Sequence, residues 1–411
     1  MQAIKIFFTG LLICLISLLA TAQPLKPGDI SPGAKTIEAD NIFPFYNGAA
    51  AIVKGMAYAL IDKDGNFIVP YNNNYGIISH MSASYTGETN GGFFTIKGSP
   101  DNIINSKGKI LTEDYHATWS VTDDGKFIAA NVQQGFILIS ESGQKYILKS
   151  ALSNIVDGIG VFTDPNYKKG YKTIKEEWIA KPVYDEAEPF SDGMACVGKK
   201  NEFGEMKYGF IDKTGKEVIP FMFSRKPASF YGGIARVEPK DITDFRIAYI
   251  DKKGTIVKKF PQMSFFEYFG NGLYSQDLKY TDVMDSTGVI VPKDEFLQKF
   301  GVAKPSSEKG NLVLRFGGKR PMYNSGKLTF LRNLRGEINK FGFIDFKTKT
   351  SVEGAFENGI LSPFVFSDPV SKLSPAVFNT TGKRDKTPLR KGYINEQGIF
   401  IIVVKGQTSQ F

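Results

Sequence analysis

The chain has 411 residues, of which 42% are hydrophobic and 13% aromatic, and 51 Lys and Arg against 42 Asp and Glu give a net charge of +9. This length exceeds one ordinary compact domain unless the chain consists of repeats that pack only on their neighbours. The sequence has only two histidines and two cysteines, and it lacks the His-x-x-x-His, Cys-x-x-Cys and Glu-x-x-His spacings of zinc sites. We therefore expect no metal site and no cofactor.

The first 22 residues have the pattern of a secretory signal peptide. Lys5 supplies a positive charge, residues 6–20 form an apolar run, and Ala20-Thr21-Ala22 fits a cleavage site. The run is shorter than the about 20 residues that span a bilayer, so we expect cleavage and no membrane span in the mature chain. These features predict an exported protein that is periplasmic, at the cell surface or secreted.

The sequence divides into four expected segments. They are the signal peptide at 1–22, an extended N-terminal leader at 23–40, a β-repeat array at 41–405 and a flexible tail at 406–411. Cleavage of the signal leaves Cys196 as the one cysteine, so no intramolecular disulfide can form. We expect Cys196 to be a packed thiol rather than a nucleophile, because no local pattern pairs it with His80 or His116.

The repeat array is marked first by a Phe-x-x-Gly motif. Its copies are Phe45/Gly48, Phe190/Gly193, Phe230/Gly233, Phe269/Gly272 and Phe356/Gly359. In the clearest copies an alanine and a β-branched residue alternate after the glycine. This alternation is typical of a β-strand with one buried face.

A second motif, Asp-x-x-Gly, joins two apolar runs, and proline often ends the second run. The clear copies are Asp62/Gly65, Asp212/Gly215, Asp251/Gly254 and Asp285/Gly288, and the weaker ones are Asn105/Gly108, Ser140/Gly143 and Asn395/Gly398. An Asp or Asn side chain can bond the backbone two residues on, and glycine supplies a left-handed conformation that closes a hairpin. The motif therefore predicts a tight turn between two strands.

These motifs predict an all-β fold, an array of about nine short three-stranded hairpin repeats. Glycines of neighbouring copies are 34 to 43 residues apart, as between Gly254 and Gly288 or Gly65 and Gly108. Such units can close into a propeller-like ring or stack as an open β-solenoid. We favour the ring, because the unit length is close to that of a propeller blade and closure removes exposed sheet edges.

The residues from Tyr208 to Pro220 resemble the WG-repeat family, whose units centre on Trp-Gly-aromatic-Ile-Asp-x-x-Gly followed by Val/Ile, Ile/Val and Pro. The similarity extends in patches from residue 41 to 405. The tryptophan is never kept, and Tyr58, Tyr208 and Phe341 stand in its place. The resemblance implies a bacterial binding or scaffolding module with no catalytic residues to carry over.

One basic segment stands apart from the interspersed charges of the rest. Between residues 309 and 336 no acidic residue occurs, and the candidate polyanion-binding residues there are Arg315, Lys319, Arg320, Lys327, Arg332 and Arg335. Clustered cations beside aromatic residues can hold an anionic polysaccharide. A solvated face with cations spread over several turns explains the same residues. The signal peptide argues against nucleic acid as the partner.

The preferred functional hypothesis is a non-enzymatic binding or scaffolding repeat protein of the cell envelope, with a protein or glycan partner. One alternative is a hydrolase of envelope or dietary glycans, built on a β-propeller. Such an enzyme needs two carboxylates held about 5 to 9.5 Å apart. Adjacent acids such as Asp123-Asp124 point to opposite faces of a strand. The other alternative is a structural spacer.

Overall fold

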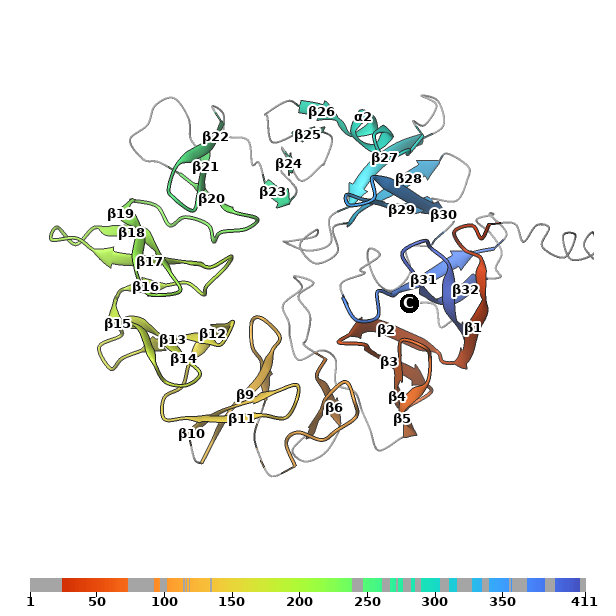
Figure 1. Cartoon of the computed structure of the whole chain (residues 1–411), viewed down its shortest axis with the longest axis horizontal. Helices are drawn as coiled ribbons and strands as arrows, with labels where there is room; N and C mark the ends of the chain where they lie inside the picture. Colours follow the sequence, from red (N-terminus) through yellow and green to blue (C-terminus); the bar gives the residue numbers. More distant parts are fainter. Residues whose placement is uncertain are drawn as a thin grey trace, which may run out of the picture.

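The computed structural model describes residues 24–72, 92–96, 102–238 except 114, 116, 118 and 134, 247–260, 267–270, 273–275, 282–284, 290–303, 310–315, 327–334, 340–354, 356, 368–380 and 389–406. These residues form nine small sheets and one short helix, which confirms the predicted all-β repeat architecture. Figure 1 shows the sheets following one another around a central region. None of the described helices is long and apolar enough to cross a membrane.

The first five sheets follow one another along the chain, each from consecutive strands. They are β2 (Asn41–Tyr46), β3 (Ala49–Lys54), β4 (Ala57–Asp62) and β5 (Phe67–Asn72); β6 (Phe94–Ile96) and β7 (Asn102–Ile104); β8 (Ser120–Val121), β9 (Phe127–Val132), β10 (Gly135–Ser140) and β11 (Lys145–Leu148); β12 (Ser153–Val156), β13 (Ile159–Thr163), β14 (Lys169–Thr173) and β15 (Trp178–Tyr184); β16 (Glu186–Ala187), β17 (Met194–Lys200), β18 (Met206–Asp212) and β19 (Glu217–Phe223).

The remaining four sheets include one that combines both ends of the array. They are β20 (Ile234–Val237), β21 (Ile247–Asp251) and β22 (Ile256–Phe260); β23 (Glu267–Gly270), β24 (Leu273–Ser275), β25 (Asp282–Met284) and β26 (Ile290–Pro292), followed by helix α2 (Lys293–Gln298); β27 (Gly310–Arg315), β28 (Lys327–Leu334), β29 (Lys340–Asp345) and β30 (Thr350–Gly354); β31 (Ser374–Asn379), β32 (Leu389–Ile394), β33 (Phe400–Lys405) and β1 (Ile30–Glu38).

Most of the described sheets have four strands, which corrects the predicted three. The additional strand lies before the Phe-x-x-Gly glycine, because this motif is itself a hairpin. In the first copy Tyr46 pairs with Ala49, and Asn47 and Gly48 between them have φ values of +50° and +82°. Two central residues with positive φ are the mark of a type I′ turn, which matches the twist of the strands on either side. The motif therefore joins the first and second strands of each unit.

The expected leader contributes a strand to the array. Residues 30–38 form β1, which pairs in parallel with β33 at the other end of the chain. Its Ile37 is 4% exposed and packs with Ile402 and Val404 in one buried cluster. The segment is extended, but it belongs to the last sheet. The signal segment and residues 407–411 of the tail lie outside the described residues.

The glycine of the WG-like motif lies where two strands approach closely. A Cβ on Gly209 would lie 2.6 Å from the Ile219 carbonyl oxygen, and one on Gly392 would lie 2.0 Å from that of Ile402. The pairing of β18 with β19 shifts register at this point, which brings the backbone of the fourth strand over the glycine. Only a residue without a side chain fits such an approach.

Consecutive units are joined by a recurring aromatic contact. The residue after the WG-like glycine packs against the phenylalanine of the next Phe-x-x-Gly turn, with 5.0 Å between the ring centroids of Tyr171 and Phe190. The Tyr171 hydroxyl donates to the Glu188 carbonyl oxygen at 2.6 Å. The last and first units meet in the same way. Tyr393 lies 4.8 Å from Phe45, and its hydroxyl donates to the Phe43 carbonyl oxygen at 2.8 Å.

Candidate binding surface

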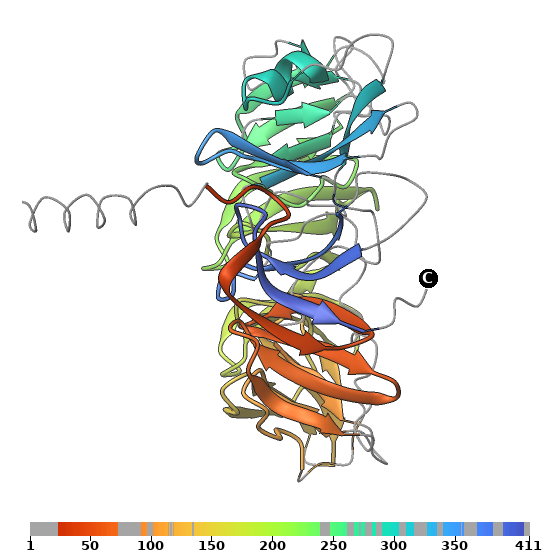
Figure 2. The same ribbon diagram turned by 90° about the vertical axis from the view of Figure 1, so that its right-hand side faces the viewer.

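The strands run between two faces of the array, which Figure 2 shows from the side. The first and third turns of a unit lie at the same end of its strands, because Ala49 after the first turn pairs with Asp62 before the third. Met194 and Asp212 pair in the same way. We call the side that carries these two turns the turn face. The opposite side carries the turns between second and third strands, and we call it the loop face.

On the turn face, the predicted Asp-x-x-Gly motif forms a turn held by its own acid. The Asp212 Oδ1 atom accepts hydrogen bonds from the backbone N–H groups of Thr214 at 2.8 Å and Lys216 at 3.1 Å. Gly215 closes the turn with φ +83°. The Thr214 hydroxyl, which also donates to this carboxylate, lowers the pKa of Asp212 more than any other group. The Oδ1 atom is therefore engaged by the turn of Asp212 itself.

The other predicted repeat turns have the same geometry where they are described. The Oδ1 atoms of Asp62 and Asp251 accept from the backbone N–H groups two and four residues on, at 2.8 to 2.9 Å. Gly65 and Gly254 close these turns with φ values of +77° and +83°. The predicted turn at Asp285 and Gly288 lies outside the described residues. These acids and glycines close turns within their own units.

Carboxylates on the turn face also connect neighbouring units. Asp192 Oδ2 accepts from the backbone N–H of Gly233 in the next unit at 2.6 Å, and Asp368 Oδ2 accepts from that of Gly48 at 3.0 Å. Asp157 forms ion pairs with Lys126 of the preceding unit and, at 2.8 Å, with Lys213 of the following one. Lys126 and then Lys213 lower the pKa of Asp157. The turn face thus uses its charged groups for assembly.

The loop face has a different character. Met56, Tyr167 and Phe203 are 86%, 83% and 80% exposed, which makes them the most exposed large hydrophobic side chains among the described residues. Each lies in the turn between second and third strands, and they come from three different units. The cores of binding surfaces are enriched in aromatic residues and methionine.

Tyr167 is also held in an unfavourable backbone conformation. Its φ is +62°, in the left-handed region. An L-residue with a large side chain loses about 1–2 kcal/mol there, and the equivalent loop-face turn that starts at Asn201 has Gly204 at this position, with φ +77°. The Asp164 carboxylate fixes the turn by accepting from the N–H groups of Asn166 at 2.9 Å and Lys168 at 2.8 Å. Sequence reasoning missed this residue, because Asp-Pro-Asn-Tyr lacks the glycine that marks the other copies.

The structure describes half of the predicted polyanion patch, and only as backbone. Arg315 lies at the end of β27, and Lys327 and Arg332 lie on β28. The last two are five positions apart, so the alternation of a strand assigns them to opposite faces of the sheet. Lys319, Arg320 and Arg335 lie outside the described residues. The patch stays a prediction.

The cysteine that we expected to be a packed thiol is a core residue. Cys196 lies on β17, is 2% exposed and packs with Phe210, Phe230 and Ala248. Burial raises the pKa of its thiol to about 12, so the thiol keeps its proton at neutral pH. Within the described part of the chain, no three His, Cys, Asp or Glu residues gather as a metal site would require. His80 and His116 are outside that part.

Comparison with solved structures gives distant similarities. A eukaryotic initiation factor is 12% identical, with 87% of this chain and 98% of that chain covered and a TM-score of 0.43. Dipeptidyl peptidase 4 of Porphyromonas gingivalis is 9% identical, with 90% and 67% covered and a TM-score of 0.37. An uncharacterized protein of Listeria monocytogenes is 11% identical, with 65% and 97% covered and a TM-score of 0.30. These values carry no conclusion about function.

Comparison of the sequence locates the family relationship in the centre of the array. No curated protein matches the sequence. The family model described as "WG containing repeat" matches residues 170–203 and 208–241. Each matched segment starts in the third strand of one sheet, β14 or β18, and extends past the strand that follows the Phe-x-x-Gly turn of the next sheet, β17 or β20. A sequence repeat therefore joins two neighbouring sheets. Two adjacent segments of this β-rich chain therefore match the WG-repeat model.

Proposed function

We propose that this chain is a non-enzymatic binding or scaffolding protein of the cell envelope that recognises a protein or glycan through its loop face. The observation that carries the proposal is the exposure of Met56, Tyr167 and Phe203 at turn tips of three units. The turn face commits its charged groups to joining units, whereas the loop face leaves apolar groups in water. The signal-peptide pattern of residues 1–22 supports export.

The three side chains suit a contact surface that adapts to its partner. Tyrosine and phenylalanine supply large, rigid apolar area, and tyrosine adds a hydroxyl at the rim. Methionine adjusts its shape to irregular surfaces. Because the turns of different units carry different residues, the surface can be specific although the sheets below repeat. The left-handed Tyr167 indicates that its ring is retained despite a cost in stability.

The test is affinity capture with the mature chain starting at Gln23. An envelope extract read by mass spectrometry reports a protein partner, and a glycan array reports a glycan. The variant with Met56→Ser, Tyr167→Gly and Phe203→Ser should lose at least about 90% of the captured partner, because contact residues of this kind carry most of the binding energy.

A matched control removes exposed apolar groups that lie on strands. The variant with Ile147→Ser, Met222→Ser and Phe67→Ser changes side chains that are 57%, 64% and 47% exposed, and it should retain the partner. Equal capture by the loop-face variant would contradict the proposal. Capture of nothing by the unaltered chain would instead favour a structural spacer, and shortening of a bound glycan would favour a hydrolase.

We further propose that the array closes as a propeller-like ring. The support is the junction between the last and first units, where Tyr393 contacts Phe45 as Tyr171 contacts Phe190. The parallel pairing of β1 with β33 adds a second connection between the ends. Closure of this kind buries a face of the last sheet against a face of the first, in the cluster that contains Ile402 and Ile52.

Small-angle X-ray scattering tests the closure. A chain that starts after Glu38 lacks β1 and should open, with a larger radius of gyration and weaker cooperativity of thermal unfolding. The matched control removes only residues 23–27, ahead of the strand, and should scatter as the mature chain does. An unchanged radius of gyration without β1, in a chain that unfolds as before, would argue for an open solenoid.

A further inference from the structure

The array departs from its own pattern between the sheet β23–β26 and the sheet β27–β30. Here the short fourth strand β26 leads into α2, the one helix among the described residues. Phe296 and Leu297 of the helix are 5% and 0% exposed, and they pack in a cluster with Val283 of one sheet and with Phe330 and Ile344 of the other. The helix therefore acts as a wedge between two units.

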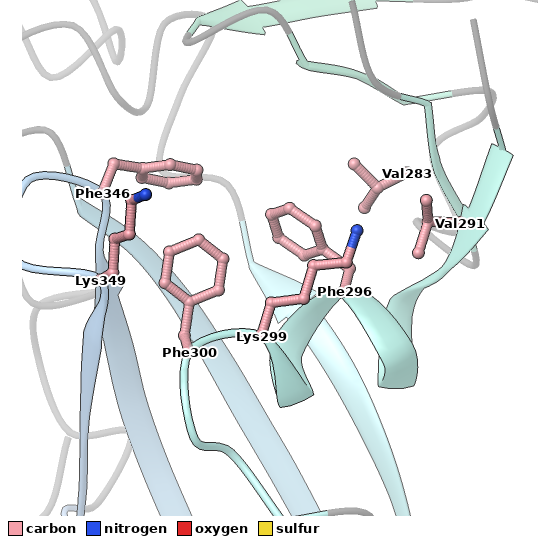
Figure 3. Close-up of a pocket in the computed structure, with 7 residues that line it drawn as sticks. All are labelled: Val283, Val291, Phe296, Lys299, Phe300, Phe346 and Lys349. Carbon is pink, nitrogen blue, oxygen red and sulfur yellow. The ribbon is translucent and has the colours of Figure 1, made fainter. Parts of the chain in front are cut away.

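A pocket of about 390 Å³ lies beside this wedge. Figure 3 shows the side chains that line it, from α2 and the residues after it, from the strands β25 and β26, and from the turn after β29. Three phenylalanine rings form an aromatic wall. The Phe300 ring lies 5.1 Å from that of Phe346 and 5.4 Å from that of Phe296, measured between centroids. Val283 and Val291 complete the apolar lining.

The two remaining lining residues are both cations. Lys299 and Lys349 are exposed, and Figure 3 shows their side chains beside the phenylalanine rings. No carboxylate lines the pocket, and neither lysine has an ion-pair partner in the described part of the chain. Two positive charges next to a wall of low dielectric attract an anion more strongly than they would in open water.

We propose that this pocket binds a small amphiphilic anion, a carboxylate carried on an acyl chain or an aryl ring. The phenylalanine and valine side chains take the apolar body, and Lys299 and Lys349 take the head. The volume lies in the lower part of the range of about 300–1,000 Å³ for small-molecule pockets, so the ligand is small. A neutral apolar ligand would leave the ammonium groups partly dehydrated without a partner, and a cation would be repelled.

Isothermal titration of the mature protein tests the chemistry of the ligand. Octanoate should bind saturably and at least tenfold more tightly than octanol, which has the same chain without the charge. Acetate, which has the head alone, should give no measurable binding. Naphthoate in a parallel titration distinguishes an aryl from an acyl body. Equal affinities for octanoate and octanol, or no saturable binding of octanoate and naphthoate, would overturn the proposal.

Variants then test whether the anion binds in this pocket. The double variant Lys299→Gln and Lys349→Gln should bind octanoate at least tenfold more weakly and leave octanol binding unchanged. Lys347→Gln removes an exposed cation from the same turn without touching the pocket, so it should leave octanoate binding unchanged. Circular dichroism and thermal unfolding should be the same for all three proteins, because the changed side chains are exposed. Full octanoate affinity in the folded double variant would also overturn the proposal.

Discussion

The same type of turn occurs on both faces of the array and serves a different purpose on each. On the turn face the Asp212 turn ends in Gly215 with φ +83°, and on the loop face the Asp164 turn ends in Tyr167 with φ +62°. Both acids accept from the N–H groups two and four residues on. A Cβ on Gly215 would lie 2.0 Å from the Ile179 carbonyl oxygen of the preceding unit, whereas the tyrosine side chain is 83% exposed.

This comparison shows how the surroundings of a turn constrain its last residue. At Gly215 the turn meets the neighbouring unit, so glycine is fixed there by contact as well as by backbone conformation. A turn on the loop face meets solvent, so the conformation alone is fixed and the side chain is free to vary. Gly215 is thus constrained by assembly of the array, whereas Tyr167 presents its side chain to solvent.

The largest expected effect is that of a methyl group on the turn face. Gly215→Ala should lower the free energy of unfolding by about 3 kcal/mol, because left-handed strain of about 1–2 kcal/mol adds to a clash with the Ile179 backbone. Gly193→Ala is the control. Its φ is +81°, but nothing lies within 4 Å of the added Cβ, so only the strain remains. Urea titration measures the free energy of unfolding of both variants. Equal losses would show that the contact with Ile179 adds nothing to the conformational strain.

We expect the acceptor side chains of the turns to stabilise both faces equally. Asn201 of the loop face accepts from the N–H groups of Phe203 at 3.0 Å and Glu205 at 2.9 Å, as Asp212 does for its own turn. Asp212→Ala and Asn201→Ala should each lower the free energy of unfolding by about 1–2 kcal/mol in urea titration, since each removes one acceptor of two backbone bonds. Stability losses that differ more than threefold would show that one face depends on its turns far more than the other.

The sequence predicted these turns because their hydrogen bonds are local. An Asp or Asn and a glycine three residues on contain all the information that the turn needs, and the weaker copy at Asn105 forms the same bonds as the clear ones. The glycine of the Phe-x-x-Gly motif was also recognised. The strand before that motif was missed, because the motif was interpreted as the start of a strand rather than as a hairpin turn.

The features that sequence reasoning missed depend on distant residues. The pairing of Ile37 with Val404 joins the two ends of the chain, and no local pattern encodes it. The apolar pocket needs Phe300 and Phe346 from different units, and their separation in sequence gives no sign of contact. A signal for Tyr167 did exist, since Asp164-Pro-Asn-Tyr aligns with Asp-x-x-Gly once the turn on the loop face is compared with those of the turn face.

Acid should weaken the charged contacts of the turn face. Asp157 and Asp212 on the turn face have pKa values below the ordinary one, so their contribution is complete above the unfolded-state pKa of about 4 and is lost as the pH falls through the folded-state value. Asn201 does not titrate. The loss should be at most about 1 kcal/mol, because these carboxylates are largely solvated and screened. Asp157→Asn should reduce the difference in unfolding free energy between pH 7 and pH 3. An unchanged difference would show that Asp157 does not contribute to the acid sensitivity.

The smallest effect on stability should accompany a large effect on binding. Tyr167→Gly removes the left-handed strain but adds flexibility to the unfolded chain, so the free energy of unfolding should stay within about 1 kcal/mol of the original or rise. Tyr167→Phe keeps the ring and the strain and should retain most of the binding. If the loop face binds the partner, Tyr167→Gly weakens its capture while thermal unfolding stays unchanged or improves. A protein that loses stability with Tyr167→Gly and keeps its partner would show that the ring serves the fold, and the distinction between the two faces would fail at its most exposed tyrosine.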